Sequence, residues 1–197
     1  APPSGNLDKE WAAEKSVKIA TLHDAVVDWL EYLGVAEEIK TTDAGVYGNR
    51  LQVSTGSGGR LHDLTNVGVG VSQVLPIVVM SLLASRGSLL IFEQPELHLH
   101  PKVQARLADF FISLSWDDKQ TLLETHSEYL VDRFRLRIAL EESTEILESV
   151  NVLFSEKRND ETALRGVKLT EYGSVIDWPE DFFDQSQGDV ARIIKAA

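Results

Sequence analysis

The segment from Leu89 to Pro101 reads LLIFEQPELHLHP and decides the fold. Ser88 to Phe92 is a short continuous apolar run after Gly87, which is typical of a strand covered on both faces of a sheet. Pro101 follows a polar loop, and proline is favoured at the first position of a helix. The segment therefore predicts a buried strand, a loop and a helix in that order.

The residues after this segment continue the alternation of strand and helix. The helix predicted from Pro101 has an inward face made of Val103, Leu107, Phe110, Phe111 and Leu114. Gln120 to Glu124 predicts the next strand, Glu128 to about Glu142 the next helix, and Val150 to Phe154 a third strand. Because strand–helix–strand connections are right-handed crossovers, this order predicts an α/β fold with a parallel sheet.

The residues before the segment predict two helices around a hairpin. Ser16 to Leu33 has helical apolar spacing and ends at Gly34. Val46 to Val53 and Leu61 to Leu64 predict two strands joined by a glycine-rich turn. A second helix is expected from Ser72 to Ala84, with Pro76 in or near its first turn.

The last part of the chain predicts a small hairpin and a tail. Val167 to Ile176 contains Tyr172-Gly173, which suits a turn between two short strands. An acidic, aromatic tail from Asp177 to Phe183 follows, and the cluster from Trp178 to Phe183 is read as packing more readily than as a docking surface for a partner.

Composition limits the class of protein. The 197 residues are 43% hydrophobic and 25% charged, which suits one soluble globular domain. The net charge of −12 argues against a broad nucleic-acid surface. The absence of cysteine excludes disulfides and fits a cytoplasmic location, and neither a membrane span nor a signal peptide is predicted. The sole methionine is Met80, so a processed chain or a fragment is expected.

Polar residues follow two of the predicted parallel strands. Glu93 and Gln94 come directly after Phe92, and Thr125-His126-Ser127 follows the strand that ends at Glu124. Ligands bind outside the carboxyl ends of parallel strands. A carboxylate there suits a nucleotide-bound Mg²⁺, and a histidine on the neighbouring strand suits contact with the terminal phosphate.

Three blocks in this order resemble the ABC-type ATPases of the AAA15 and overcoming-lysogenization-defect (OLD) group, in particular members with a C-terminal DUF3696 domain. Residues 66–76 (NVGVGVSQVLP) resemble the signature motif that opens a helix. Residues 89–101 resemble a Walker B strand running into a D-loop, and residues 123–127 (LETHS) resemble an H-loop. The resemblance implies the parallel-sheet half of a P-loop NTPase core, preceded by a helix and hairpin.

The resemblance implies roles for individual residues. Glu93 matches the acid that holds Mg²⁺, and Gln94 stands where the family commonly has the glutamate that activates water. His126 matches the switch histidine that contacts the γ-phosphate. The signature, which would face a nucleotide held by a second subunit, is matched by Gly68, Gly70, Ser72 and Gln73. The D-loop, which is a subunit contact, is matched by His98 and His100.

A Walker A loop is missing from the sequence. That loop needs G-x-x-x-x-G-K-[ST], and no Gly-Lys pair occurs in the 197 residues. The glycines at 56, 58 and 59 do not replace it, because no lysine lies between Lys40 and Lys102. The expectation is a full-length ATPase whose P-loop lobe precedes this chain, with this chain alone inactive.

Each candidate also has an alternative reading. Glu93 could be an ordinary strand-end carboxylate, His126 a hydrogen-bonded core histidine, and Gly68 and Gly70 simple turn glycines. The histidines at 98 and 100 could ligate a metal together with Glu96.

The main functional prediction is an ATPase that binds ATP and Mg²⁺ at a homodimer interface and hydrolyses ATP slowly. The resemblance implies anti-phage defence or DNA maintenance with an effector, a nuclease being the candidate, and DNA contact, if any, by segments outside this chain. The alternatives are a non-catalytic ATP-sensing assembly module and, less favoured, a nuclease. Three parts are predicted: residues 1–60 leading to the signature, 61–155 as the ATPase core, and 156–197 as a DUF3696-like extension.

Overall fold

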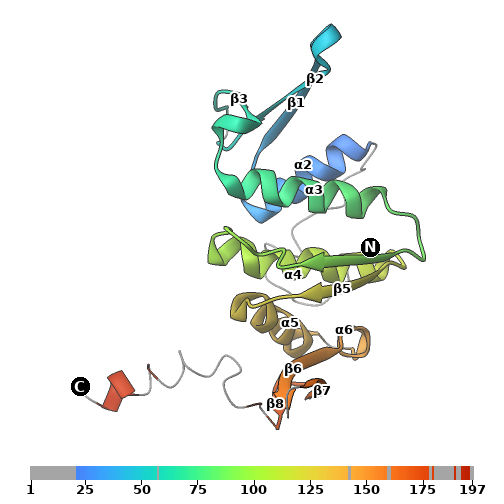
Figure 1. Ribbon diagram of the computed structural model, residues 1–197, viewed down its shortest axis with the longest axis vertical. Coiled ribbons are helices and arrows are strands. Elements are labelled where there is room, and N and C mark those ends of the chain that lie inside the picture. The colour runs from blue at the N-terminus through green and yellow to red at the C-terminus, as the bar shows by residue number, and fades with distance from the viewer. Residues whose placement is uncertain are drawn as a thin grey trace. The chain divides into compact units, whose positions relative to one another are not determined.

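The computed structural model describes residues 21–56, 58–141, 143–158, 161–177, 179, 189 and 192–195. The chain divides into two compact units, residues 1–133 and 134–197 (Figure 1). The predicted boundaries at residues 60 and 155 remain a prediction. No helix in these described ranges is long and apolar enough to cross a membrane.

The first unit begins with helix α2, Leu22–Leu33, which lies beside helix α3 (Figure 1). The Thr21 hydroxyl caps α2 by accepting from the backbone N–H of Asp24, and Gly34 ends the helix with a left-handed φ of 76°. The predicted end at Leu33 is confirmed. The predicted start at Ser16 is wrong for a continuous helix, because Thr21 is extended, and residues 16–20 lie outside the described residues.

A small antiparallel sheet follows α2. It has the order β1-β2-β3, with β1 at Glu38–Asp43, β2 at Asn49–Ser54 and β3 at His62–Asp63, and it carries the 3-10 turns Gly45–Tyr47 and Leu64–Asn66. The pairing of β2 with β3 confirms the predicted hairpin. The sequence did not predict β1, in which only Ile39 is buried.

Helix α3 runs from Val69 to Leu83, three residues earlier than the predicted start at Ser72. Pro76 is therefore inside the helix and not in its first turn, which corrects the prediction. Proline lacks the N–H that would bond the carbonyl four residues before it, so one backbone bond of the helix is given up at this point.

The segment that decides the fold has the predicted order. Strand β4 (Leu89–Glu93) pairs in parallel with β5 (Gln120–Glu124), and α4 (Pro101–Trp116) connects them. Pro101 occupies the first turn of α4, and four of the five predicted inward residues are buried: Leu107, Phe110, Phe111 and Leu114. The α/β class and the parallel sheet are confirmed.

One expectation about β4 is wrong. Phe92 is buried against Phe111, with 5.5 Å between ring centroids, but Leu89 and Ile91 on the other face of β4 are exposed, as is Leu122 of β5. The described residues cover one face of this two-stranded sheet, so the continuous apolar run does not mark a strand buried on both faces here.

Helix α5, Glu128–Leu140, contains the boundary between the units. The second unit continues with α6 (Glu145–Ser149) and a sheet of order β6-β7-β8, at Val152–Arg158, Glu161–Leu169 and Val175–Ile176. The β7–β8 pairing confirms the predicted hairpin. The third predicted strand corresponds to β6, but β6 pairs antiparallel with β7 and is not a third strand of the parallel sheet. The predicted cluster from Trp178 to Phe183 lies almost wholly outside the described residues.

Candidate nucleotide site

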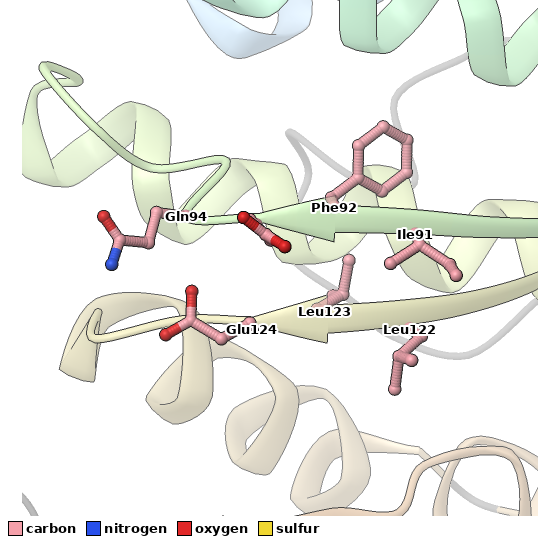
Figure 2. Close-up of a pocket in the computed structure, with 7 residues that line it drawn as sticks. Ile91, Phe92, Gln94, Leu122, Leu123 and Glu124 are labelled. Atoms are coloured by element: carbon pink, nitrogen blue, oxygen red, sulfur yellow. The ribbon is translucent and has the colours of Figure 1, made fainter.

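A shallow pocket lies over the carboxyl ends of β4 and β5. It is lined by residues 91–94 and 122–124, and Figure 2 shows Gln94 and Glu124 at the same end of the two strands. Glu93 and Glu124 are direct partners in the parallel ladder, so the two carboxylates lie on adjacent strands at the same position along the sheet. The sequence drew attention to Glu93 but did not assign Glu124 a role.

Gln94 has an unusual backbone. Its φ is 45°, in the left-handed region that non-glycine residues seldom adopt. The Gln94 N–H donates to the carbonyl of Glu124 at 2.8 Å, and the Gln94 carbonyl accepts from the N–H of Leu97 at 3.1 Å. The turn that follows β4 is thereby fixed to the end of β5. Strained backbone of this kind is concentrated at functional sites.

His126 lies beside Glu124, one of the residues that line the pocket. Its Nε2 is 3.2 Å from Glu124 Oε1, and its side chain is 76% exposed. A core histidine would be enclosed, so that alternative for His126 is wrong. The structure therefore brings Glu93, Gln94 and His126 to adjacent strand ends, while their catalytic roles remain predictions.

The loop between β4 and α4 carries two histidines in different local settings. His98 is exposed with a φ of 61°. His100 caps α4, and its Nδ1 accepts from the N–H of Lys102 at 3.2 Å. Glu96, in contrast, is buried and accepts from the N–H of His126. Within the described part of the chain, no group of three His, Asp or Glu side chains is placed to hold a metal, so the His98, His100 and Glu96 alternative is not supported.

The predicted signature forms the start of α3. Gly68 is the N-cap with φ −59°, and Gly70 is the second residue of the helix. Neither has a positive φ, and a Cβ added at Gly68 would meet nothing within 4 Å, while one at Gly70 would make an ordinary 3.5 Å contact with Leu99. The fold therefore does not require glycine at either position, which removes the reason for reading them as simple turn glycines.

The helix start itself suits an anion. No side chain caps it, its first turn holds no acidic residue, and Ser72 and Gln73 are exposed. The Ser72 hydroxyl donates to the Val69 carbonyl at 2.8 Å. Within the described part of the chain, no side chain is thus seen to neutralise the N–H groups of this helix start and the positive end of the helix dipole.

The described fold and site agree with a family match. The family described as the AAA ATPase domain matches residues 5–131, which is well over half of the chain. The chain belongs to the AAA ATPase domain family. In this AAA ATPase chain, a second family, described as a protein of unknown function (DUF3696), matches residues 147–193. The two matches confirm the predicted architecture and its order. A comparison with proteins of curated function finds no match.

Several solved structures share the fold of this AAA ATPase chain. One, described under ATP-driven dimerization and DNA-stimulated activation of SMC ATPases, is 10% identical with a TM-score of 0.56, and the match covers 90% of this chain and 98% of that one. The Smc head domain of Pyrococcus furiosus, bound to the C-terminal domain of ScpA, is 8% identical with a TM-score of 0.55, covering 89% and 38% respectively. A head bound to the C-winged helix domain of ScpA is 9% identical with a TM-score of 0.57, covering 77% and 43%. The chain thus spans less than half of the latter two.

The donor set suits a magnesium-bound nucleotide. Glu93 is an exposed carboxylate at a strand end, and Glu124 adds a second carboxylate beside it. Mg²⁺ prefers oxygen ligands and keeps several waters, so one or two carboxylates are enough to hold it beside substrate phosphates. The residues therefore fit the cofactor that the family implies.

Proposed function

We propose that this chain supplies the Walker B, D-loop, H-loop and signature parts of ATP sites formed between two subunits. A Walker A loop would come from outside these 197 residues, on the same polypeptide or another. We use the term assembled ATPase for this chain together with the part that carries the Walker A loop. The observation that carries the proposal is the pairing of Glu93 with Glu124 at the ends of parallel strands, with His126 beside Glu124. ATP-driven dimerization is described for SMC ATPases, which share this fold, and supports the same arrangement here.

Each element would have a separate task. Glu93 would hold Mg²⁺ through water, and the metal when bound offsets the charge of the phosphates. His126 would donate to the γ-phosphate from its exposed position. The start of α3, with Gly68, Gly70 and Ser72, would bind the nucleotide of the opposite subunit through backbone N–H groups.

Gln94 sets the expected rate. Its amide can orient a water but cannot accept the proton of that water. We therefore expect slow hydrolysis and long-lived ATP-bound dimers. The same feature favours the second candidate function, an ATP-sensing assembly module that recruits an effector without needing turnover. Anti-phage defence or DNA maintenance with a nuclease effector is our proposal for the cellular role, and it rests on the family resemblance.

A mixing experiment tests the shared site. His126→Ala disables the element that acts on a subunit's own nucleotide, and Ser72→Glu places a carboxylate where the opposite nucleotide would bind. Ser72 is exposed, and glutamate near a helix start is compatible with the helix dipole, so the fold is expected to persist. Homodimers of either variant of the assembled ATPase should be inactive.

Mixed dimers should recover activity, because one of their two sites then contains neither substitution. The expected result is ATP hydrolysis in the mixture and none in the separate variants. A mixture as inactive as its components would contradict a site shared between subunits. Sedimentation of the unaltered protein with and without ATP provides the matched measure of dimer formation.

The recruitment function has its own test. An effector that binds the assembled ATPase only with ATP, and whose complex becomes shorter-lived when Gln94→Glu accelerates hydrolysis, would identify the ATP-bound state as the signal. Deleting residues 177–183 examines whether the tail provides the contact. Binding that ignores nucleotide would rule out the sensing function.

A further inference from the structure

The loop after β4 and the loop after β5 are joined by a buried carboxylate. Oε1 of Glu96 accepts the backbone N–H of His126 at 2.8 Å, across 30 positions of sequence. Glu96 is 6% exposed, and its other oxygen, Oε2, is buried without a hydrogen-bond partner in the part of the chain that the structure describes. Among the described residues, the bond to His126 is therefore the hydrogen bond that holds this carboxylate.

A second bridge runs beside the first. Gln104, in the first turns of α4, donates through Nε2 to the carbonyl of Leu99 at 2.8 Å and accepts through Oε1 from the hydroxyl of Ser127 at 2.6 Å. The Ser127 oxygen in turn accepts the N–H of Leu130 in α5 at 3.1 Å. Residues 94–100 and 125–127 are thus tied together at two points.

The side chain of His126 is not fixed by packing. It is 76% exposed, and its ring contacts the half-exposed carboxylate of Glu124. The position of the ring therefore depends mainly on the backbone that carries it, and the N–H of that backbone is bound by Glu96. A hydrogen bond to a charged acceptor is stronger than one between neutral groups, particularly away from water.

We infer that Glu96 is a positioning residue that couples the D-loop to the switch histidine. The inference rests on the proposed function, because it assumes that the D-loop residues His98 and His100 meet the opposite subunit and that His126 meets the γ-phosphate. A displacement of the D-loop on dimer formation would pass through Glu96 to the backbone of His126. Hydrolysis would then be tied to the correct closure of the dimer, although Glu96 itself touches neither ATP nor the partner.

Three variants of the assembled ATPase test this role. Glu96→Ala removes the acceptor, whereas Glu96→Gln keeps an acceptor oxygen on a side chain of the same length and removes the charge. Glu38→Ala is the matched control, because Glu38 is an exposed glutamate of β1. Hydrogen exchange at the His126 amide reports the bond directly and needs no catalysis.

For Glu96→Ala we expect the His126 amide to exchange roughly tenfold faster or more, as the loss of a charge-assisted bond implies. We expect kcat to fall about tenfold or more through misplacement of a catalytic group, with the KM for ATP changed less than about twofold. Glu96→Gln should restore both quantities most of the way, and Glu38→Ala should match the unaltered protein. A merely structural role would lower stability without this separation of kcat from KM.

Two results would overturn the inference: unchanged exchange at His126 in Glu96→Ala, or faster exchange with an unchanged kcat. A Glu96→Gln variant as impaired as Glu96→Ala would also overturn it, since the accepting oxygen would then not be what matters. Failure of the proposed function looks different, because the unaltered protein would hydrolyse no ATP while exchange at His126 still reports whether Glu96 holds the loop.

Discussion

Arg133 binds Asp109 in the interior of the first unit, with 2.8 Å between Nη2 and Oδ2. The Asp109 side chain is fully buried and that of Arg133 is 15% exposed. The hydroxyl of Tyr32 donates to the same carboxylate, so α2, α4 and the start of α5 meet at one charged group. A buried carboxylate is tolerated only when it is paired and hydrogen-bonded.

Arg133→Leu should destabilise the first unit strongly. The substitution leaves the Asp109 carboxylate buried without its cation, and breaking a buried pair from one side costs about 3–5 kcal/mol. Urea unfolding followed by circular dichroism measures the change. The matched control is Arg50→Leu, which breaks an exposed pair with Asp63 and should alter the free energy of unfolding little. Equal effects of the two substitutions would contradict the importance of burial.

The Tyr32 hydroxyl should lose its proton at a higher pH than an ordinary tyrosine. Burial raises the pKa of Tyr32 to about 12, aided by the neighbouring charge of Asp109 and the bond to it, although Arg133 acts in the opposite direction. Between pH 10 and the raised value the folded state holds a proton that the unfolded state has lost, so stability is full below about pH 10 and falls as the pH rises towards 12. Ultraviolet titration should show this late tyrosine, and Tyr32→Phe should remove it. A titration curve identical in Tyr32→Phe would disprove the assignment.

Asp117 should contribute stability that acid removes. The hydrogen bond from Lys119, whose side chain is 4% exposed, holds the pKa of Asp117 below its usual value of 3.8. A depressed carboxyl pKa stabilises the fold above that value and loses its effect as the pH falls through the folded-state pKa. Asp117→Asn should therefore lower the urea midpoint of unfolding at pH 7. The difference in midpoint from the unaltered protein should shrink below about pH 4.

The control for Asp117 is its neighbour. Asp118→Asn removes an exposed carboxylate from the same loop, and asparagine suits the positive φ of 55° at that position. We expect Asp118→Asn to keep the pH profile of the unaltered protein. A midpoint difference in Asp117→Asn that persisted undiminished at pH 3 would show that the ion pair with Lys119 is not its source.

Gly70→Ala should separate folding from ATP binding. The added methyl group meets Leu99 at an ordinary distance and lies in a helix, so stability should be unchanged or rise by up to about 1 kcal/mol. The methyl group would however stand at the helix start proposed to face a nucleotide. We expect an unchanged melting temperature with weaker ATP-dependent dimer formation in the assembled ATPase, measured by sedimentation. Normal dimer formation would remove Gly70 from the signature.

Gln94→Glu should accelerate hydrolysis. A carboxylate at this position can accept the proton of the attacking water, and general-base catalysis contributes about 10²–10⁴-fold. The nearby carboxylates of Glu93 and Glu124 oppose a further negative charge, so a rise of about tenfold is the more modest expectation. Single-turnover measurements separate this chemical step from product release. Fast turnover in the unaltered protein, with no gain in Gln94→Glu, would contradict the proposed slow mechanism.

Local signals explain which parts of the fold were predictable. The apolar run of β4 and the proline at 101 fix a strand end and a helix start within a few residues, and both were predicted correctly. Strand β1 was missed because its sequence, EIKTTD, is polar and only Ile39 is buried. The start of α3 was misplaced because Pro76 is compatible with a first turn, whereas the structure accommodates it mid-helix.

Long-range pairing explains what the sequence did not predict. A strand period identifies β6 but carries no information on its partner, which is β7 in an antiparallel pair. At the candidate site, Glu93, Gln94 and His126 follow recognisable strands, but Glu96 and Gln104 form hydrogen bonds to residues 30 and 23 positions away in sequence. A bond such as that of Glu96 to the His126 amide leaves no spacing pattern.

The sheet β6-β7-β8 consists of strands joined to their immediate neighbours in sequence. Closing such short loops costs little chain entropy, and proteins rich in local contacts fold quickly. The ATPase core contains a non-local pairing, because β4 and β5 are separated in sequence by the whole of α4. The two units should therefore acquire structure on different timescales, and the C-terminal sheet should recover its hydrogen bonds first during refolding.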